Sequence, residues 1–145
     1  MLTLSKLVGF GIIAGSAVLK VPQIMKIINA GSVEGISKSL FYIETLMLVN
    51  SASYSIKSNI PFSVYGENLI ILSQNIVIVL LFWAYSKHIG ILEKVVLFFG
   101  FSAYAFVLFS GNTYLNDFQW GIVQKINMAL VLPSRVPQII TNFQN

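Results

Sequence analysis

Apolar residues run along this chain in five long segments that are separated by short polar stretches. Two segments, residues 68–86 and 95–116, contain no charged residue at all. Three others, residues 7–28, 36–56 and 118–143, are equally long but are each interrupted by two charges. A helix needs roughly 20 residues to cross the hydrocarbon core of a bilayer. The pattern therefore predicts five transmembrane helices.

The composition agrees with this pattern. Hydrophobic residues make up 56% of the 145 residues and charged residues only 10%, against about 25% in ordinary soluble domains. With a mean hydropathy of +0.79, a chain this short cannot hide its apolar surface in a single soluble core. We expect an all-α membrane protein in the lipid bilayer. The absence of cysteine excludes disulfides and thiolate metal sites, and the net charge of +4 forms no basic cluster that would indicate a nucleic-acid partner.

The connections between the segments are short and rich in turn residues, so consecutive helices are expected to be antiparallel neighbours. Lysines near the helix ends favour one orientation weakly. One side carries Lys26, Lys38, Lys87 and Lys94, and the other carries Lys6, Lys57 and Lys125. This bias predicts a lumenal N-terminus and a cytosolic C-terminus. Residues 1–19 also fit a signal peptide, but the apolar run continues to residue 28, which favours a span.

Two ionisable residues lie at matching depths in the first two segments. Lys20 is about eight residues before the end of the first, and Glu44 about eight residues after the start of the second. At 1.5 Å per residue, both lie roughly 12 Å from the same membrane surface. An ion pair between them is one interpretation, because intramembrane charges usually pair inside a bundle. The alternative is that Lys20 extends to the headgroups and Glu44 is protonated.

The five residues KVPQI (20–24) are repeated almost unchanged as RVPQI (135–139). Each copy places a positive charge, Lys20 or Arg135, beside a proline that removes a helix hydrogen bond. Pro22 and Pro137 could form hinges, with the amides of Gln23 and Gln138 bonding the loosened backbone. A static kink is the simpler alternative.

Further polar residues lie near the middles of the second and third segments. Asn50, Gln74 and Asn75 are candidates for lining a cavity, although interhelical hydrogen bonding explains them equally well. Gly11 and Gly15 form a GxxxG pattern, which is typical of close helix approach. His88 is the single histidine, and no motif for nucleophilic, metal or phosphate chemistry appears. We therefore expect no enzyme, no cofactor and no metal.

The paired Pro-Gln motifs resemble those of PQ-loop membrane proteins. Two blocks, GIIAGSAVLKVPQIMKIINAGSVEGIS (11–37) and SYSIKSNIPFSVYGE (53–67), are similar to the mannose-P-dolichol utilisation defect family. The resemblance implies a first three-helix repeat over residues 1–88, with helices at about 7–28, 36–57 and 66–86. It further implies a linker helix within residues 89–116 and an incomplete second, parallel repeat over 117–145. The family pattern has seven helices, of which this chain accounts for five.

The resemblance also implies a function. It predicts a non-enzymatic protein of the endoplasmic reticulum membrane that supports the use of dolichol-phosphate-linked mannose and glucose in glycosylation. Partners would be dolichol-phosphate sugars and glycosyltransferases, and a homo-oligomer is left open. The alternatives are a small-solute transporter of the SWEET or lysosomal type, or a non-functional fragment of either kind.

Overall fold

The computed structural model describes the backbone of residues 2–144 and the side chains of residues 3–132. Its helices are α1 (Leu2–Ser16), α2 (Val21–Ala30), α3 (Lys38–Lys57), α4 (Phe62–Tyr85), α5 (Ile91–Phe109), the short 3₁₀ helix η1 (Gly111–Thr113) and α6 (Asp117–Gln144). No strand occurs in the described residues, which confirms the all-α prediction. Two boundaries differ from the sequence prediction. The first span is broken into α1 and α2, and α5 ends at Phe109 because Gly111 turns the chain with a φ of 66°.

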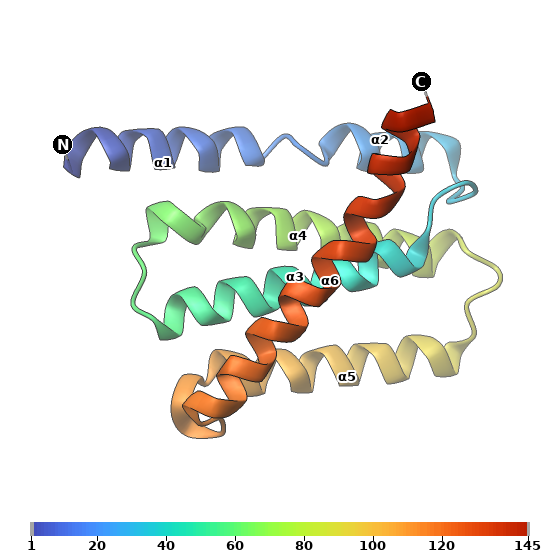
Figure 1. Cartoon of the computed structure of the whole chain (residues 1–145). Helices are drawn as coiled ribbons and strands as arrows, with labels where there is room; N and C mark the ends of the chain where they lie inside the picture. Colours follow the sequence, from blue (N-terminus) through green and yellow to red (C-terminus); the bar gives the residue numbers. More distant parts are fainter. Residues whose placement is uncertain (1, 145) are drawn as a thin grey trace.

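Chain order and spatial order differ at the start of the bundle (Figure 1). Helices α1 and α2 lie in line and pack on α4, and α4 in turn packs on α3. The expectation that consecutive helices are neighbours holds only in part: α2 packs mainly on α4 and meets α3 through a few side chains, and α5 packs on α3 more than on α4. Helices α5 and α6 both pack on α3, which α6 crosses diagonally. Helix α3 is thus the centre of the bundle.

The closest backbone approach between α1 and α4 is at Gly9. A β-carbon at Gly9 would overlap the backbone carbonyl of Ser63 in α4. Helices can approach this closely only where a residue is very small. The GxxxG pattern points to the wrong positions, since a β-carbon at Gly11 or Gly15 would meet no atom within 4 Å. Those two glycines face outwards.

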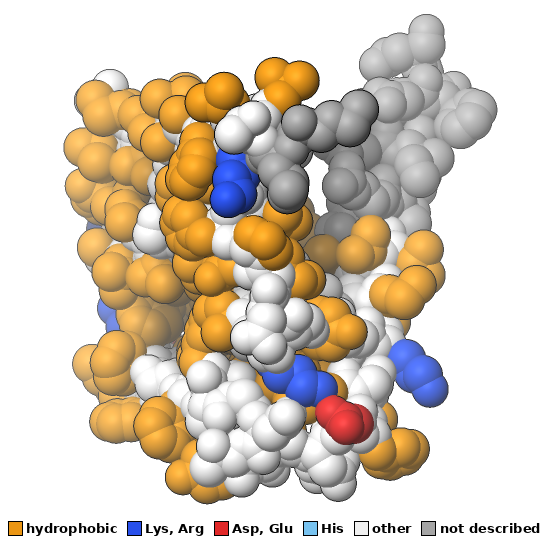
Figure 2. All heavy atoms as spheres, turned by 90° about the vertical axis from the view of Figure 1, so that its left-hand side faces the viewer, with side chains coloured by type: hydrophobic (Ala, Val, Ile, Leu, Met, Phe, Trp, Pro, Cys, Tyr) orange, Lys and Arg blue, Asp and Glu red, His pale blue; other side chains and the backbone are white. Residues whose placement is uncertain are grey.

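Within the described residues, three helical stretches are long and apolar enough to cross a membrane: Thr3–Ala30, Phe62–Tyr85 and Ile91–Phe109. Helix α3 is less apolar because it carries Glu44, Asn50 and several serines and threonines. Its central place explains this composition, since neighbouring helices shield it from lipid. The serine hydroxyls of α3 bond its own backbone, as Ser53 does to the Val49 carbonyl at 2.7 Å. Figure 2, a view of the end of the bundle nearest the N-terminus, shows hydrophobic side chains gathered along one side and polar and charged side chains in its centre and lower part.

The first part of α6 is attached to α3 by an aromatic residue and an ion pair. Trp120 is buried in a cluster with Val49, Leu72 and Leu108. Lys57 Nζ lies 2.7 Å from the Asp117 carboxylate and 5.5 Å from the Trp120 ring. The hydrogen bond from Lys57 lowers the pKa of Asp117, which lies just outside the predicted span. Helices α1 and α6 start at the same end of the bundle (Figure 1), as two parallel repeats require.

Candidate functional site: a polar cluster beside the broken first helix

The break between α1 and α2 follows from Pro22. Proline has no N–H to donate, and its ring clashes with the carbonyl of the residue four positions earlier. Residues 17–20 accordingly leave the α-helix, with weak bonds such as Leu19 N to Ser16 O at 3.2 Å. Helix α2 restarts with Pro22 in its first turn, a position where a missing N–H does no harm. The interrupted stretch leaves backbone groups without helix partners.

A side chain from α4 bonds these backbone groups. Gln74 Nε2 donates to the carbonyls of Ser16, at 3.1 Å, and Ala17, at 2.5 Å. The carbonyl oxygen of the same side chain accepts from Lys20 N at 3.2 Å. One amide therefore satisfies both donors and acceptors of the break. The sequence suggested Gln23 for this role, but the Gln23 side chain makes no hydrogen bond within the described residues.

The break places Lys20 against α3 and α4. Its ammonium lies 2.5 Å from Glu44 Oε2 and donates to Asn75 Oδ1 at 2.9 Å. The side chain of Lys20 is only 14% exposed, whereas that of Glu44 is 39% exposed. The ion pair suggested by their matching depths is therefore present, and the alternative of a lysine extending to the headgroups is not observed. Helix α2 is tied to both neighbouring helices through one ammonium.

Asn75 connects this ion pair to the backbone of α3. It is fully buried, and its Nδ2 donates to the Phe41 carbonyl at 2.9 Å and to Thr45 Oγ1 at 2.7 Å. Thr45 in turn donates to the same Phe41 carbonyl at 2.7 Å. The Phe41 ring lies 5.0 Å from the Lys20 ammonium, close enough for a cation–π contact. Each polar atom of Asn75 is thus paired, as burial in apolar surroundings demands.

This polar cluster consists of Lys20, Glu44, Gln74, Asn75, Thr45 and Phe41. The sequence identified four of its members and missed Thr45 and Phe41. Their spacing contained a partial signal, because Phe41 lies three residues before Glu44 and Thr45 lies four residues after Phe41. Helix periodicity applied to Glu44 would have found Phe41, but not Thr45.

Other predicted residues lie elsewhere. Asn50 is buried between α3 and α5, where its Oδ1 accepts from Tyr104 Oη at 2.5 Å. Its Nδ2 has no hydrogen-bond partner within the described residues. The second motif, Arg135, Pro137 and Gln138, lies in α6 but outside the residues whose side chains are described. Its proposed equivalence with the first motif remains a prediction.

The cluster can bind and position a polar group inside an apolar bundle. Lys20 offers an ammonium with three donors, and its bonds to Glu44 and Asn75 use two of them. Glu44 offers a partly exposed carboxylate that accepts hydrogen bonds. Asn75 and Gln74 are held by backbone groups and change partners less readily. The described residues contain no group of three or more His, Asp or Glu side chains that could hold a metal ion.

Comparison with known families gives one match. Residues 4–64 match the family described as PQ loop repeat. This segment is less than half of the chain, and it spans the broken first helix, α3 and the start of α4. No solved structure matches the chain. Together with the membrane-spanning helices, the match supports a multi-pass membrane protein of the PQ-loop type.

Proposed function

We propose that this chain is a PQ-loop membrane protein of the endoplasmic reticulum, without enzymatic activity, that supports the use of dolichol-phosphate-linked mannose and glucose. The observation that carries the proposal is the polar cluster around Lys20, held inside an apolar bundle at a break in the first helix. Ionisable residues within the membrane mark sites of function by default. The finer assignment is supported by the resemblance of residues 11–37 and 53–67 to the mannose-P-dolichol utilisation defect family.

The chemistry of such a lipid suits the cluster. A dolichol-phosphate sugar combines a long apolar chain with hydroxyl groups and a phosphate. The Lys20 ammonium can exchange one of its hydrogen-bonded protein partners for one of these oxygens. Glu44 is the partner most readily exchanged, because its side chain is 39% exposed. The proposal involves binding and positioning, and no chemical step. The N-terminus would be lumenal and the C-terminus cytosolic.

A second function, transport of a small solute, is favoured by a specific observation. Transporter sites are often built beside discontinuous helices, near polar groups inside the membrane. The break at residues 17–20, bonded by Gln74, has this form. The same geometry therefore serves either a lipid-linked sugar or a soluble cargo.

The two functions are separated by measuring rescue and uptake together. The chain is expressed in cells that cannot use lipid-linked mannose, and glycosylation of a reporter protein is measured. The purified chain in liposomes is tested for uptake of labelled sugars and amino acids. The proposal predicts restored glycosylation without uptake. Uptake without rescue would establish the transporter instead, and neither activity in a stably expressed chain would support a non-functional fragment.

A further inference from the structure

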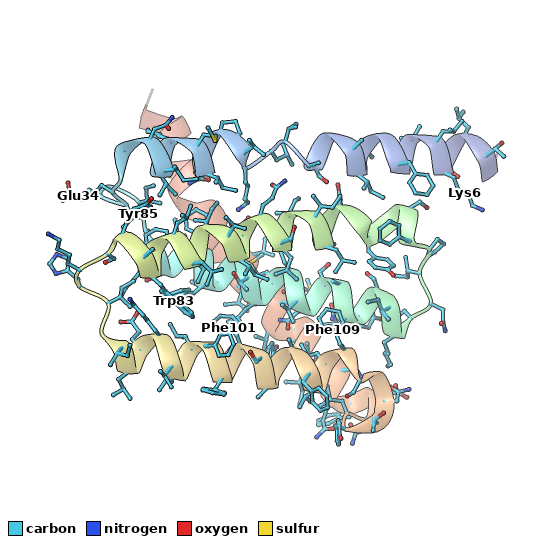
Figure 3. All side chains as sticks on the ribbon, turned by 180° about the vertical axis from the view of Figure 1, so that it is seen from behind. Lys6, Glu34, Trp83, Tyr85, Phe101 and Phe109 are labelled. Atoms are coloured by element: carbon cyan, nitrogen blue, oxygen red, sulfur yellow. The ribbon has the colours of Figure 1, made fainter. Side chains whose placement is uncertain are left out.

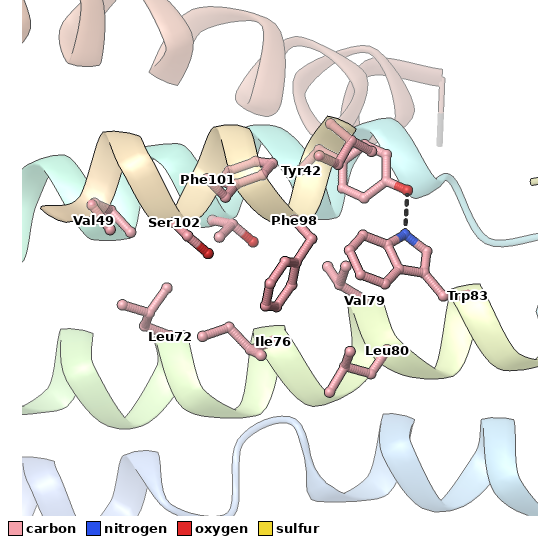
Figure 4. Close-up of a pocket in the computed structure, with 13 residues that line it drawn as sticks. Tyr42, Val49, Leu72, Ile76, Val79, Leu80, Trp83, Phe98, Phe101 and Ser102 are labelled. Atoms are coloured by element: carbon pink, nitrogen blue, oxygen red, sulfur yellow. Dashed lines mark hydrogen bonds between the residues drawn. The ribbon is translucent and has the colours of Figure 1, made fainter. Parts of the chain in front are cut away.

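An apolar groove runs between α4 and α5 and has α3 as its floor (Figure 4). Its volume is about 300 Å³. The groove is open along its side, since Ile76, Leu80 and Phe98 are each about half exposed, at 46%, 51% and 55%. It exists because α4 and α5 each pack on α3 and only weakly on each other. Figure 4 shows Phe98 projecting into the space between α4 and α5.

The groove faces away from α6. In Figure 1 α6 crosses in front of α3, and in Figure 3, seen from behind, Trp83 and Phe101 lie between the ribbons of α4 and α5. No described segment covers the opening. In a bilayer, the groove therefore opens towards lipid rather than towards another part of the bundle.

One end of the groove is polar and aromatic. Trp83 Nε1 donates to Tyr42 Oη at 3.0 Å across the end of the groove. Lys94 Nζ donates to the Trp83 carbonyl at 2.5 Å. One turn before Tyr42, Lys38 forms an ion pair with Glu93 at 2.8 Å. Tryptophan and tyrosine prefer the membrane interface, which places this end at headgroup level.

The charge at this end is unbalanced. The Glu93 carboxylate is engaged by Lys38. Lys94 contacts a neutral carbonyl, and among the described residues no carboxylate lies within ion-pair distance of it. An ammonium has three N–H donors, of which this bond uses one. Lys94 can therefore donate to an anionic oxygen without leaving Trp83.

We propose that this groove binds a single-chain lipid phosphate, with the chain along α4 and α5 and the phosphate at Lys94. The size of the groove suits a segment of one chain. At roughly 30 Å³ for each water-sized group, about 300 Å³ corresponds to around ten methylene-sized units. The phosphate supplies the negative charge that is missing beside the Lys94 ammonium. The proposal rests on the proposed function, since a dolichol phosphate is also a single-chain lipid phosphate, but its test measures lipid binding without any glycosylation readout.

The chain contains only two tryptophans, Trp83 and Trp120, which makes the test direct. In the variant Trp120→Phe, fluorescence comes from Trp83 alone. The purified protein in detergent micelles is titrated with hexadecyl phosphate that carries a quenching doxyl group on its chain. Unlabelled hexadecyl phosphate and hexadecanol then compete with it. The matched variant Trp83→Phe, which reports from Trp120, measures quenching that is not local to the groove.

We expect strong quenching of Trp83 and competition by the phosphate at about fivefold lower concentration than by the alcohol, the preference expected from one lysine. Lys94→Gln should abolish this preference while keeping a donor for the Trp83 carbonyl. Its control, Lys125→Gln, removes an exposed charge from α6 and should keep the preference. Ala105→Phe fills the groove and should reduce quenching, whereas Ala103→Phe, on an exposed position of α5 that does not line the groove, should not.

Ser102→Phe provides a second way to fill the groove if Ala105→Phe fails to fold, because Ser102 is exposed and lies outside the core. Equal competition by phosphate and alcohol, unchanged in Lys94→Gln, would overturn the headgroup assignment. Quenching that persists in both groove-filling variants would show that the lipid phosphate quenches Trp83 from outside the groove, and would overturn the proposal.

Discussion

At the scale of single residues, Lys20 joins three separate helical segments. Its ammonium contacts Glu44 of α3 and Asn75 of α4, and its backbone N–H contacts Gln74 of α4. Removing one member of such an ion pair leaves the other charge without compensation in apolar surroundings. Removing both charges together is much less damaging, and apolar replacements of similar size can even stabilise a fold.

Glu44→Gln should destabilise the chain by roughly 1–3 kcal/mol, less than the 3–5 typical of fully buried pairs, because Glu44 is partly exposed. The double variant Lys20→Met with Glu44→Leu should lose less stability than the single variant. Thermal unfolding in detergent measures both. Glu34→Gln, at an exposed loop position, is the control and should change little. The single variants Lys20→Met and Glu44→Leu complete the comparison. If the double variant loses as much free energy of unfolding as these two lose together, the ion pair contributes nothing.

At the scale of helices, the first span depends on a break and on the side chain that bonds it. Pro22 interrupts the helix, and Gln74 takes over the bonds that the helix loses. Helix α4 makes both contacts with the first span. Its Gln74 bonds the break, and its Ser63 backbone lies close to Gly9 of α1. These two contacts determine how α1 and α2 pack on α4.

Gln74→Leu should cost about 1–3 kcal/mol, because it leaves the Ser16 and Ala17 carbonyls unpaired. In a Pro22→Ala background the helix can bond its own carbonyls, so the same change should cost less. A double-mutant cycle on unfolding free energies should give a coupling of about 1 kcal/mol or more. An equal penalty in both backgrounds would mean that Gln74 does not serve the break.

The glycines of α1 should differ sharply in their tolerance of a methyl group. Gly9→Ala should destabilise by about 1–3 kcal/mol, because the added β-carbon meets the Ser63 carbonyl. Gly11→Ala is the matched control, and it should be neutral or slightly stabilising since alanine favours helix and no atom lies nearby. If both changes cost the same, the close approach of α1 and α4 is not real.

At the scale of the whole molecule, α1 and α6 begin at the same end of the bundle, and the connection between α4 and α5 lies at the other. Single cysteines can test this in an otherwise cysteine-free chain. Thr3→Cys and Thr113→Cys should react with a membrane-impermeant maleimide from the same side of the membrane. His88→Cys should react from the opposite side. Labelling of positions 3 and 113 from opposite sides would contradict the parallel arrangement.

Hydropathy was sufficient to predict that the chain is all-helical and where its long apolar segments lie, but not the break after Ser16 or the end of α5 at Phe109. The depth of Lys20 and Glu44 was sufficient to predict their ion pair. The placement of α4 between α2 and α3 was not predictable, since short connections only suggest neighbours. Nor was the role of Gln74, because any amide at a similar depth, including Gln23, could have bonded the break. Such choices depend on packing between helices that lie far apart in the sequence.

The most direct test of the account is glycosylation rescue by the double variant Lys20→Met with Glu44→Leu. This variant keeps an apolar, well-packed site but removes the charges that would bind a sugar phosphate. The control variant, Lys57→Met with Asp117→Asn, removes the ion pair near the start of α6. In cells that cannot use lipid-linked mannose, at matched expression and with normal unfolding behaviour, the account predicts rescue by the wild type and the control, and none by the Lys20–Glu44 variant. Full rescue by that variant would show that the ion pair only supports the fold, and would contradict a functional role for the polar cluster.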